Sequence, residues 1–192
     1  KAIRGYNTVD FTKASKNSVL LDGYGASYKT APITLKNFSS VTISYIPRKL
    51  NAESTNNFVV GLSDKEASFV NTKNDSGSGL VAEMITAKGR NDVFAFCDKE
   101  LIAGAIEKTY TNKLPNINKN LKDTEIKVTF TRYEQVIDGV EYFGTFTLNA
   151  RGNTYTREIL MTDNLKALGD TFYVIAGCQL NVGNIFEITG IS

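Results

Sequence analysis

Short segments in which apolar and polar residues alternate run through this chain of 192 residues. In the segments 41–45, 126–131 and 142–149, one set of alternate positions is largely apolar and the other polar. Because successive side chains of a β-strand point to opposite faces of a sheet, this pattern predicts strands with one buried and one solvent-exposed face. The positions predicted to face the core are Val41, Ile43, Tyr45, Ile126, Val128, Phe130, Tyr142, Gly144, Phe146 and Leu148.

Four other segments are apolar almost without interruption. They comprise residues 58–62, 80–85, 93–97 and 172–178. Continuous apolar runs of this length are typical of central strands that are covered on both faces.

Turn-forming residues separate these strands. Asp138-Gly139 stands between two strand-forming segments and predicts a hairpin with a type I′ turn. The segment 151–153 predicts a second turn of similar kind, and the Asn-, Ser- and Gly-rich segment 71–79 predicts a loop.

Helical signals are few. The segment 163–169 predicts one or two helical turns, with Asp163 as the N-cap and Gly169 as the stop. The segment 100–109 fits a short helix or a strand equally well.

Together, these elements predict an all-β protein made of two stacked antiparallel sheets, a β-sandwich of the jelly-roll type with at most one or two short helices. A closed barrel is the alternative. We find no internal repeat or linker, and we therefore expect residues 1–192 to form a single domain.

The chain contains no histidine. This absence excludes Ser-His-Asp and Cys-His nucleophile systems and histidine-containing zinc or iron sites. The formal net charge is only +2, with the basic residues dispersed, so no nucleic-acid partner is implied.

The two cysteines, Cys97 and Cys178, each lie in an apolar segment. They fit either two buried, reduced thiols or a disulfide between facing strands. Two thiols without histidine do not make a standard zinc site.

No apolar segment is long enough to cross a membrane, so no membrane insertion is expected. The chain begins at Lys1, and its methionines are Met84 and Met161. We therefore expect a processed or excised segment of a larger protein, which suits a secreted or multidomain parent.

The order of the strand-forming segments also carries a family resemblance. In chain order, these are the strands Val41–Ile46 and Phe58–Asp64, a loop that enters a strand at Gly77–Val81, the strands Lys127–Arg132 and Gly144–Asn149, a short helical turn at Leu165–Leu168, and the strands Tyr173–Gly177 and Ile185–Ile191. Over residues 18–191 the chain resembles the concanavalin A-like lectin and glucanase superfamily, which includes laminin-G-like domains. The resemblance implies a jelly roll whose relatives are mostly carbohydrate- or protein-binding modules and in some cases glycosidases.

Three carboxylates are candidates for ligand binding or catalysis. Glu83 interrupts an apolar strand, so it needs a partner or an open cleft. Asp98 and Glu100 are two residues apart and would share one face of a strand, although a solvated turn after Cys97 is the expected explanation. Glycoside hydrolysis needs two facing carboxylates, and the acidic strand that glucanases of the superfamily carry is absent.

Tyrosines are the candidates for stacking on sugar rings. Tyr24 and Tyr28 lie in the glycine-rich segment 22–28, where a role in core packing is less expected. Tyr142 is a further candidate, with a place in the strand as its alternative explanation. The absence of tryptophan weighs against binding to cellulose-like surfaces.

Calcium is the ion that the resemblance implies. Asn71, Asn74 and Asp75 form the densest oxygen-rich loop cluster and are the candidate ligands, although an ordinary polar loop has the same composition. No organic cofactor is expected.

The sequence leads to three functional hypotheses. The leading one is a non-catalytic, lectin-like module that binds carbohydrate outside the cell or at its surface. The second is an adhesion or structural module with a protein partner, which an exposed apolar patch would favour. The third is a glycoside hydrolase or lyase that uses Glu83 with Asp98 or Glu100.

Overall fold

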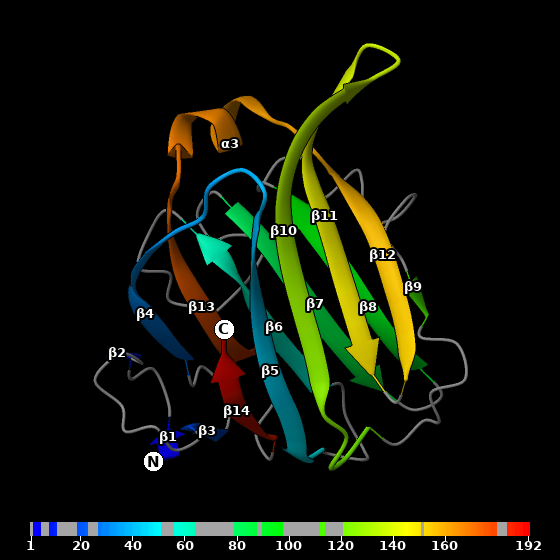
Figure 1. Ribbon diagram of the computed structural model, residues 1–192. Helices are drawn as coiled ribbons and strands as arrows, with labels where there is room; N and C mark the ends of the chain where they lie inside the picture. The colour runs from blue at the N-terminus through cyan, green and yellow to red at the C-terminus, as the bar shows by residue number, and fades with distance from the viewer. Residues whose placement is uncertain are drawn as a thin grey trace.

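The protein consists of β-strands and a short helix in the part that its computed structural model describes (Figure 1). The described residues are 2–4, 8–10, 19–22, 27–50, 56–63, 79–87, 90–97, 112–113, 121–150, 152–179 and 184–192. Within these ranges no helix is long and apolar enough to cross a membrane.

Two sheets make up the fold. The first sheet contains, in spatial order, β1 (Ala2–Arg4), β3 (Val19–Asp22), β14 (Ile185–Ile191), β5 (Ser39–Lys49), β10 (Ile126–Ile137), β11 (Val140–Ala150) and β12 (Asn153–Leu160). The second sheet contains β2 (Thr8–Asp10), β4 (Ser27–Thr34), β13 (Thr171–Gln179), β6 (Asn56–Ser63), β7 (Gly79–Ala87), β8 (Arg90–Cys97) and β9 (Asn112–Lys113).

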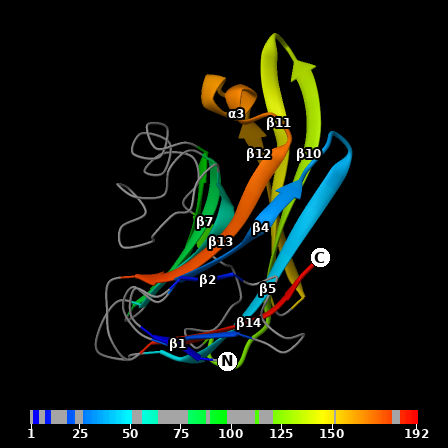
Figure 2. The same ribbon diagram turned by 90° about the vertical axis from the view of Figure 1, so that its left-hand side faces the viewer.

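Neighbouring strands run antiparallel, except for the short pairs β1–β3 and β2–β4, which are parallel. The sheets face each other as two layers (Figures 1 and 2). The predicted β-sandwich is therefore confirmed, and the barrel alternative is wrong because the sheets keep separate edges.

The core lies between the two sheets and is rich in aromatic rings. Phe58 of the second sheet stacks on Phe186 of the first, with ring centroids 4.3 Å apart. Tyr45 lies 4.7 Å from the same Phe58 ring, and all three side chains are buried. Burial of side chains of this size stabilises the sandwich by roughly 2–3 kcal/mol each.

The alternation of β5 and β10 matches their burial. Buried and less buried residues alternate from Val41 to Tyr45 and from Ile126 to Phe130. Strand β13 is different, because the consecutive residues Val174, Ile175 and Ala176 are all fully buried. Both faces of this strand are thus covered, as its continuous apolar sequence predicts.

The Asp138-Gly139 turn joins β10 to β11. Its φ angles of 52° and 79° are those of a type I′ turn, and Ile137 pairs with Val140 across it. This prediction is confirmed.

The alternation predicted for β11 assigns its first residues to the wrong faces of the sheet. A β-bulge between Tyr142 and Gly144 shifts the register with β12. As a result Phe143, which the alternation placed on the solvent face, is fully buried, and Tyr142 is only half-buried. A bulge adds a residue to one strand and reverses the alternation beyond it.

Helix α3 (Asp163–Leu168) forms where the sequence predicts it, but its N-cap is Thr162 and not Asp163. The Thr162 hydroxyl accepts a hydrogen bond from the Leu165 amide at 3.2 Å. Gly169 ends the helix with a φ of 67°. Thr and Asp are both good N-caps, and the prediction chose the wrong one of these two neighbours.

The strand order separates the two cysteines. Cys97 lies on β8 and Cys178 on β13, with β7 and β6 between them. Three steps between strands place their backbones roughly 14 Å apart, beyond the reach of a disulfide. The disulfide alternative is therefore wrong.

Candidate carbohydrate-binding groove

A row of threonines crosses the outer face of the first sheet. Thr129 of β10 pairs with Thr42 of β5 on one side and with Thr147 of β11 on the other. Thr147 in turn pairs with Thr156 of β12. The four residues alternate with core-facing neighbours, so their side chains lie on the face away from the core. We call these four residues the threonine row.

Hydrogen bonds between hydroxyl groups order this row. The Thr42 and Thr129 Oγ1 atoms are 2.8 Å apart, and the Thr147 and Thr156 Oγ1 atoms are 3.2 Å apart. Each hydroxyl offers one donor and two acceptor positions. In the Thr42–Thr129 pair this one hydrogen bond uses one donor and one acceptor position, and the other positions can serve a ligand.

A second polar row lies beside the first. Lys127 pairs with Ser44 and with Asn149, and Asn149 pairs with Thr154. The Asn149 Nδ2 atom donates a hydrogen bond to the Thr154 hydroxyl at 3.0 Å. The carboxamide oxygen of Asn149 is an acceptor that points away from this bond.

Thr42, Thr129 and Thr147 of the first row, with Lys127 and Asn149 of the second, form the floor of an open groove with a volume of about 960 Å³. The loop 121–125, which connects into β10, forms its rim. Leu121 anchors this loop in the core, and the Asp123 amide donates to the Pro47 carbonyl at 2.8 Å. The lining residues are Thr42, Lys122, Asp123, Thr124, Glu125, Lys127, Thr129, Thr147, Asn149 and Ser192.

The charges of the groove cancel. Its two lysines, Lys122 and Lys127, are balanced by Asp123 and Glu125. Asp123 Oδ1 is 3.0 Å from the Arg48 guanidinium, and Glu125 Oε1 is 3.6 Å from Lys127 Nζ. A groove of hydroxyl and amide groups without net charge is suited to hydrogen bonding with a neutral, polar ligand.

Arg48 holds the rim to the sheet. Its guanidinium donates to Glu187 Oε2 at 2.7 Å and to Asp123 Oδ1 at 3.0 Å. The hydrogen bond to Glu187, followed by the one to Asp123, raises the pKa of Arg48 above its ordinary value. These two hydrogen bonds join the rim loop to β5 and β14.

Solved structures share this fold. A legume lectin-like domain from Entamoeba histolytica superposes with a TM-score of 0.61 at 11% identity, covering 93% of this chain and 84% of that one. The potassium-bound carbohydrate recognition domain of Emp46p gives 0.56 at 11% identity, covering 97% and 92%. The Ca²⁺/Man-bound exoplasmic/lumenal domain of VIP36 gives 0.56 at 8% identity, covering 93% and 78%.

The chain has the fold of a legume lectin-like domain. The resemblance to the concanavalin A-like superfamily is thereby confirmed for the fold. No protein-family model and no curated protein sequence matches the chain.

The residues predicted to bind a ligand are distributed over both sheets of this lectin-like fold. Tyr28 lies on β4 and Glu83 on β7 of the second sheet, with β13 and β6 between them. Tyr142 lies in the first sheet, at the base of the β10–β11 hairpin. Tyr142 therefore belongs to a different sheet from Tyr28 and Glu83, and ligand binding by any of the three stays a prediction.

The other predicted residues lie outside the described part of the chain. They are Tyr24, Asp98, Glu100, Asn71, Asn74 and Asp75. Among the described residues, no group of three or more acidic or cysteine side chains is arranged to hold a metal ion. Calcium binding through residues 71–75 stays a prediction.

The groove itself is not predicted by the pattern of any single strand. Thr42, Thr129 and Thr147 were recognised only as solvent-facing positions of their strands. A signal was present, because all three strands carry threonine at such a position. To make these residues neighbours, however, β5 must lie beside β10, and alternation within a strand does not reveal which strands pair.

Proposed function

We propose that this chain is a lectin-like module that binds carbohydrate in the groove over the threonine row. The observation that carries the proposal is the neutral array of hydroxyl and amide groups on the groove floor. Sugar hydroxyl groups both donate and accept hydrogen bonds, as do the groups of this floor. The open shape admits a ligand without any change of the backbone.

The structural relatives support this proposal. Emp46p is described as a carbohydrate recognition domain, and the VIP36 domain was solved with Ca²⁺ and Man. A neutral glycan is thus the ligand class that the groove and the shared fold favour together. The fold alone does not fix the ligand.

Metal and location form part of the proposal. We propose that calcium assists binding, with Asn71, Asn74 and Asp75 as its ligands, because carboxylate and amide oxygens are the donors that calcium prefers. An extracellular or lumenal location fits the exoplasmic/lumenal VIP36 domain.

A glycan array tests the function directly. The purified chain is screened once with calcium and once with a chelator. Selective binding to neutral glycans supports the proposal, and its loss in chelator supports the metal site. An array that stays blank in both conditions contradicts the carbohydrate-binding proposal.

The second sheet offers the competing location. Glu83 pairs with Val59 and Phe94 near the centre of this sheet. If Glu83→Gln abolishes glycan binding while groove variants retain it, the ligand binds to the second sheet. If Glu83→Gln instead abolishes turnover of a glycan, the module is a glycosidase or lyase.

A further inference from the structure

Exposed apolar side chains gather at one place in the described part of the chain. All the large apolar residues that are exposed there belong to the β10–β11 hairpin or to the turn next to it. They are Phe38, Tyr133, Val136, Ile137 and Val140, with exposed fractions of 74%, 45%, 65%, 41% and 42%. Contiguous exposed apolar groups on a soluble protein commonly mark an interaction site.

The hairpin projects beyond the rest of the sandwich (Figures 1 and 2). Strand β5 pairs with β10 only as far as Arg132, so the following residues of β10 extend past their neighbour. At the tip, Ile137 pairs with Val140 while Val136 pairs with Glu141. Because adjacent pairs of a hairpin point to opposite faces, apolar side chains lie on both faces of the tip.

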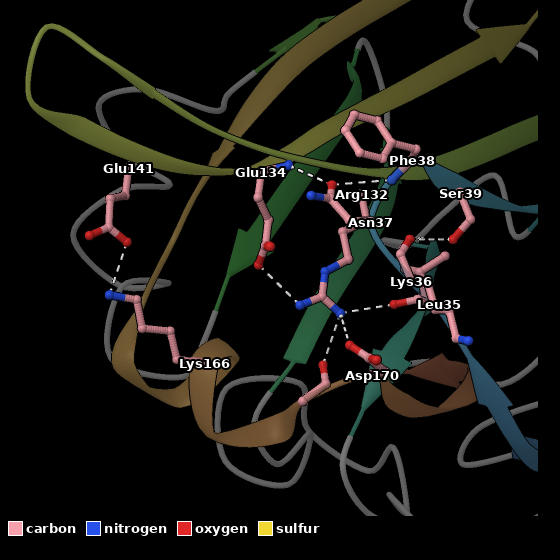
Figure 3. A network of polar contacts seen from close by, with 11 residues as sticks. Leu35, Lys36, Asn37, Phe38, Ser39, Arg132, Glu134, Glu141, Lys166 and Asp170 are labelled. Atoms are coloured by element: carbon pink, nitrogen blue, oxygen red, sulfur yellow. Dashed lines mark hydrogen bonds and ion pairs between the residues drawn. The ribbon is translucent and has the colours of Figure 1, made fainter.

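The base of the hairpin is held rigidly by Arg132 (Figure 3). This buried guanidinium donates to the carbonyls of Leu35 and Gly169, at 2.9 and 3.0 Å. It also contacts Asp170 Oδ1 at 2.8 Å and Glu134 Oε1 at 3.0 Å. One side chain thus joins the hairpin to the turn before β5 and to the end of helix α3.

The second strand of the hairpin is fixed as well (Figure 3). Glu141 Oε2 is 2.9 Å from Lys166 Nζ of helix α3. The Met161 amide donates to the Glu141 carbonyl at 3.0 Å. An anchored hairpin loses little conformational entropy on binding, which favours association.

The charge of the hairpin is one-sided. Its residues 133–142 include Glu134, Asp138 and Glu141 and no basic residue. Glu134 and Glu141 are paired with Arg132 and Lys166 at the base. Asp138 is the turn residue at the tip, and none of the described residues forms an ion pair with it. Its carboxylate can therefore attract a cation of a partner.

We propose that the tip of this hairpin docks onto a protein partner through an apolar segment that carries lysine or arginine. The apolar groups Val136, Ile137 and Val140 supply the contact area. Asp138 supplies the charge that selects a basic partner and rejects an acidic one. This inference is independent of the carbohydrate groove, which lies over the other end of the same strands.

Two other occupants fit less well. In a symmetric contact between two copies of the chain, the acidic tips would face each other and repel. Insertion into a lipid bilayer would bury the Asp138 charge first, because it sits at the leading end of the hairpin. A basic protein segment meets neither obstacle.

The test uses two fluorescent peptides of ten residues. In the lysine peptide leucine alternates with lysine, and in the glutamate peptide leucine alternates with glutamate. They are titrated into the ¹⁵N-labelled chain while its amide resonances and the peptide anisotropy are followed. We expect the lysine peptide to shift the resonances of residues 136–140 and the glutamate peptide to leave them unchanged. Affinity for the lysine peptide is expected to fall as salt is raised.

Two variants sharpen the test. In V136T/V140T one of the two methyl groups of each valine is replaced by a hydroxyl of similar size, so we expect about tenfold weaker binding of the lysine peptide. Asp138→Asn keeps the turn, since Asn-Gly also favours type I′. It removes the charge at the tip, so we expect binding of the lysine peptide to lose its salt dependence. Unchanged melting temperatures verify that both variants fold.

Several results would overturn the proposal. They are no binding of either peptide, equal binding of both, or lysine-peptide binding that V136T/V140T leaves intact. Self-association in light scattering that V136T/V140T abolishes would assign the tip to a second copy. Sedimentation with phosphatidylcholine vesicles that the same variant abolishes would assign it to lipid.

Discussion

Thr129 of β10 and Thr147 of β11 face each other across the two strands. The Thr129 hydroxyl contacts the hydroxyl of Thr42, and the Thr147 hydroxyl contacts that of Thr156. Side chains opposite each other in an antiparallel pair have Cβ atoms about 5 Å apart. The two central threonines therefore present neighbouring hydroxyl and methyl groups at the middle of the groove. Any ligand that lies across the strands contacts both.

The length of the row predicts a preference for oligosaccharides. Equivalent positions on neighbouring strands repeat about every 4.8 Å, so the part of the row that lines the groove, from Thr42 to Thr147, spans about 10 Å. A single sugar ring covers only part of this span. We expect affinity for manno-, chito- or xylo-oligosaccharides to rise as the ligand grows from one sugar ring to three, and calorimetry measures this affinity. Equal affinity for a single ring and a trisaccharide would contradict binding along the row.

Gly144 is predicted to be irreplaceable at the β-bulge. A Cβ atom at this position would overlap the carbonyl oxygen of Thr131 and lie 2.8 Å from the Tyr133 nitrogen, and both are backbone atoms that cannot move aside easily. We expect Gly144→Ala to lower the free energy of unfolding by about 3 kcal/mol or more in urea denaturation.

Gly152→Ala is the matched control for Gly144→Ala. Gly152 has a φ of 75°, but a Cβ atom there meets nothing within 4 Å. We expect a cost of about 1–2 kcal/mol from the backbone conformation alone. Equal costs for the two variants would show that the close approach at Gly144 is not the cause.

Arg132 is predicted to contribute more to stability than Arg48. Arg132→Met removes the donor to two backbone carbonyls from a buried site, which is expected to cost about 3 kcal/mol. Arg48 is more exposed, with 38% of its side chain accessible against 8% for Arg132, so Arg48→Met is expected to cost much less than Arg132→Met. Urea denaturation of both variants measures the difference, and the reverse order would contradict the role of the Arg132 cluster.

Much of the fold is readable in the sequence. The alternation of β5 and β10 and the Asp138-Gly139 turn are local features, and local features fix strands and hairpins. The bulge at Tyr142 is different, because nothing local marks where an extra residue enters a strand. The phase of β11 was therefore predicted wrongly.

The candidate site was less accessible to sequence reasoning. Glu83 and Tyr142 were each selected for the chemistry of the side chain, and they lie in different sheets. Thr42 and Thr129 are 87 positions apart and touch only because β5 and β10 pair. Contacts of this kind depend on the order of the strands, which is set by the packing of the whole sandwich.

Stability is predicted to fall at alkaline pH because of Tyr45. Burial raises the pKa of the Tyr45 phenol above its ordinary value of about 10, so the folded state keeps a proton that the unfolded state releases. The stabilising effect is therefore complete below about pH 10 and is lost as the pH rises further. Urea denaturation from pH 8 to 11 should show this decline in the free energy of unfolding. The decline should be shallower in Tyr45→Phe. An equal slope in both proteins would show that Tyr45 is not its cause.

The groove proposal has a matched pair of variants. T129V/T147V removes two hydroxyls from the groove floor while keeping side-chain size. T131V/T145V removes two hydroxyls from the next row of the same strands, which does not line the groove. Both pairs should fold with similar melting temperatures, because all four side chains are partly exposed.

The decisive measurement is calorimetric titration of a glycan that binds the unmodified chain into both variants. If the threonine row holds the ligand, T129V/T147V weakens binding about tenfold, as expected for the loss of two hydrogen bonds, and T131V/T145V leaves it unchanged. Binding that T129V/T147V does not weaken would contradict the proposal that carbohydrate binds in this groove.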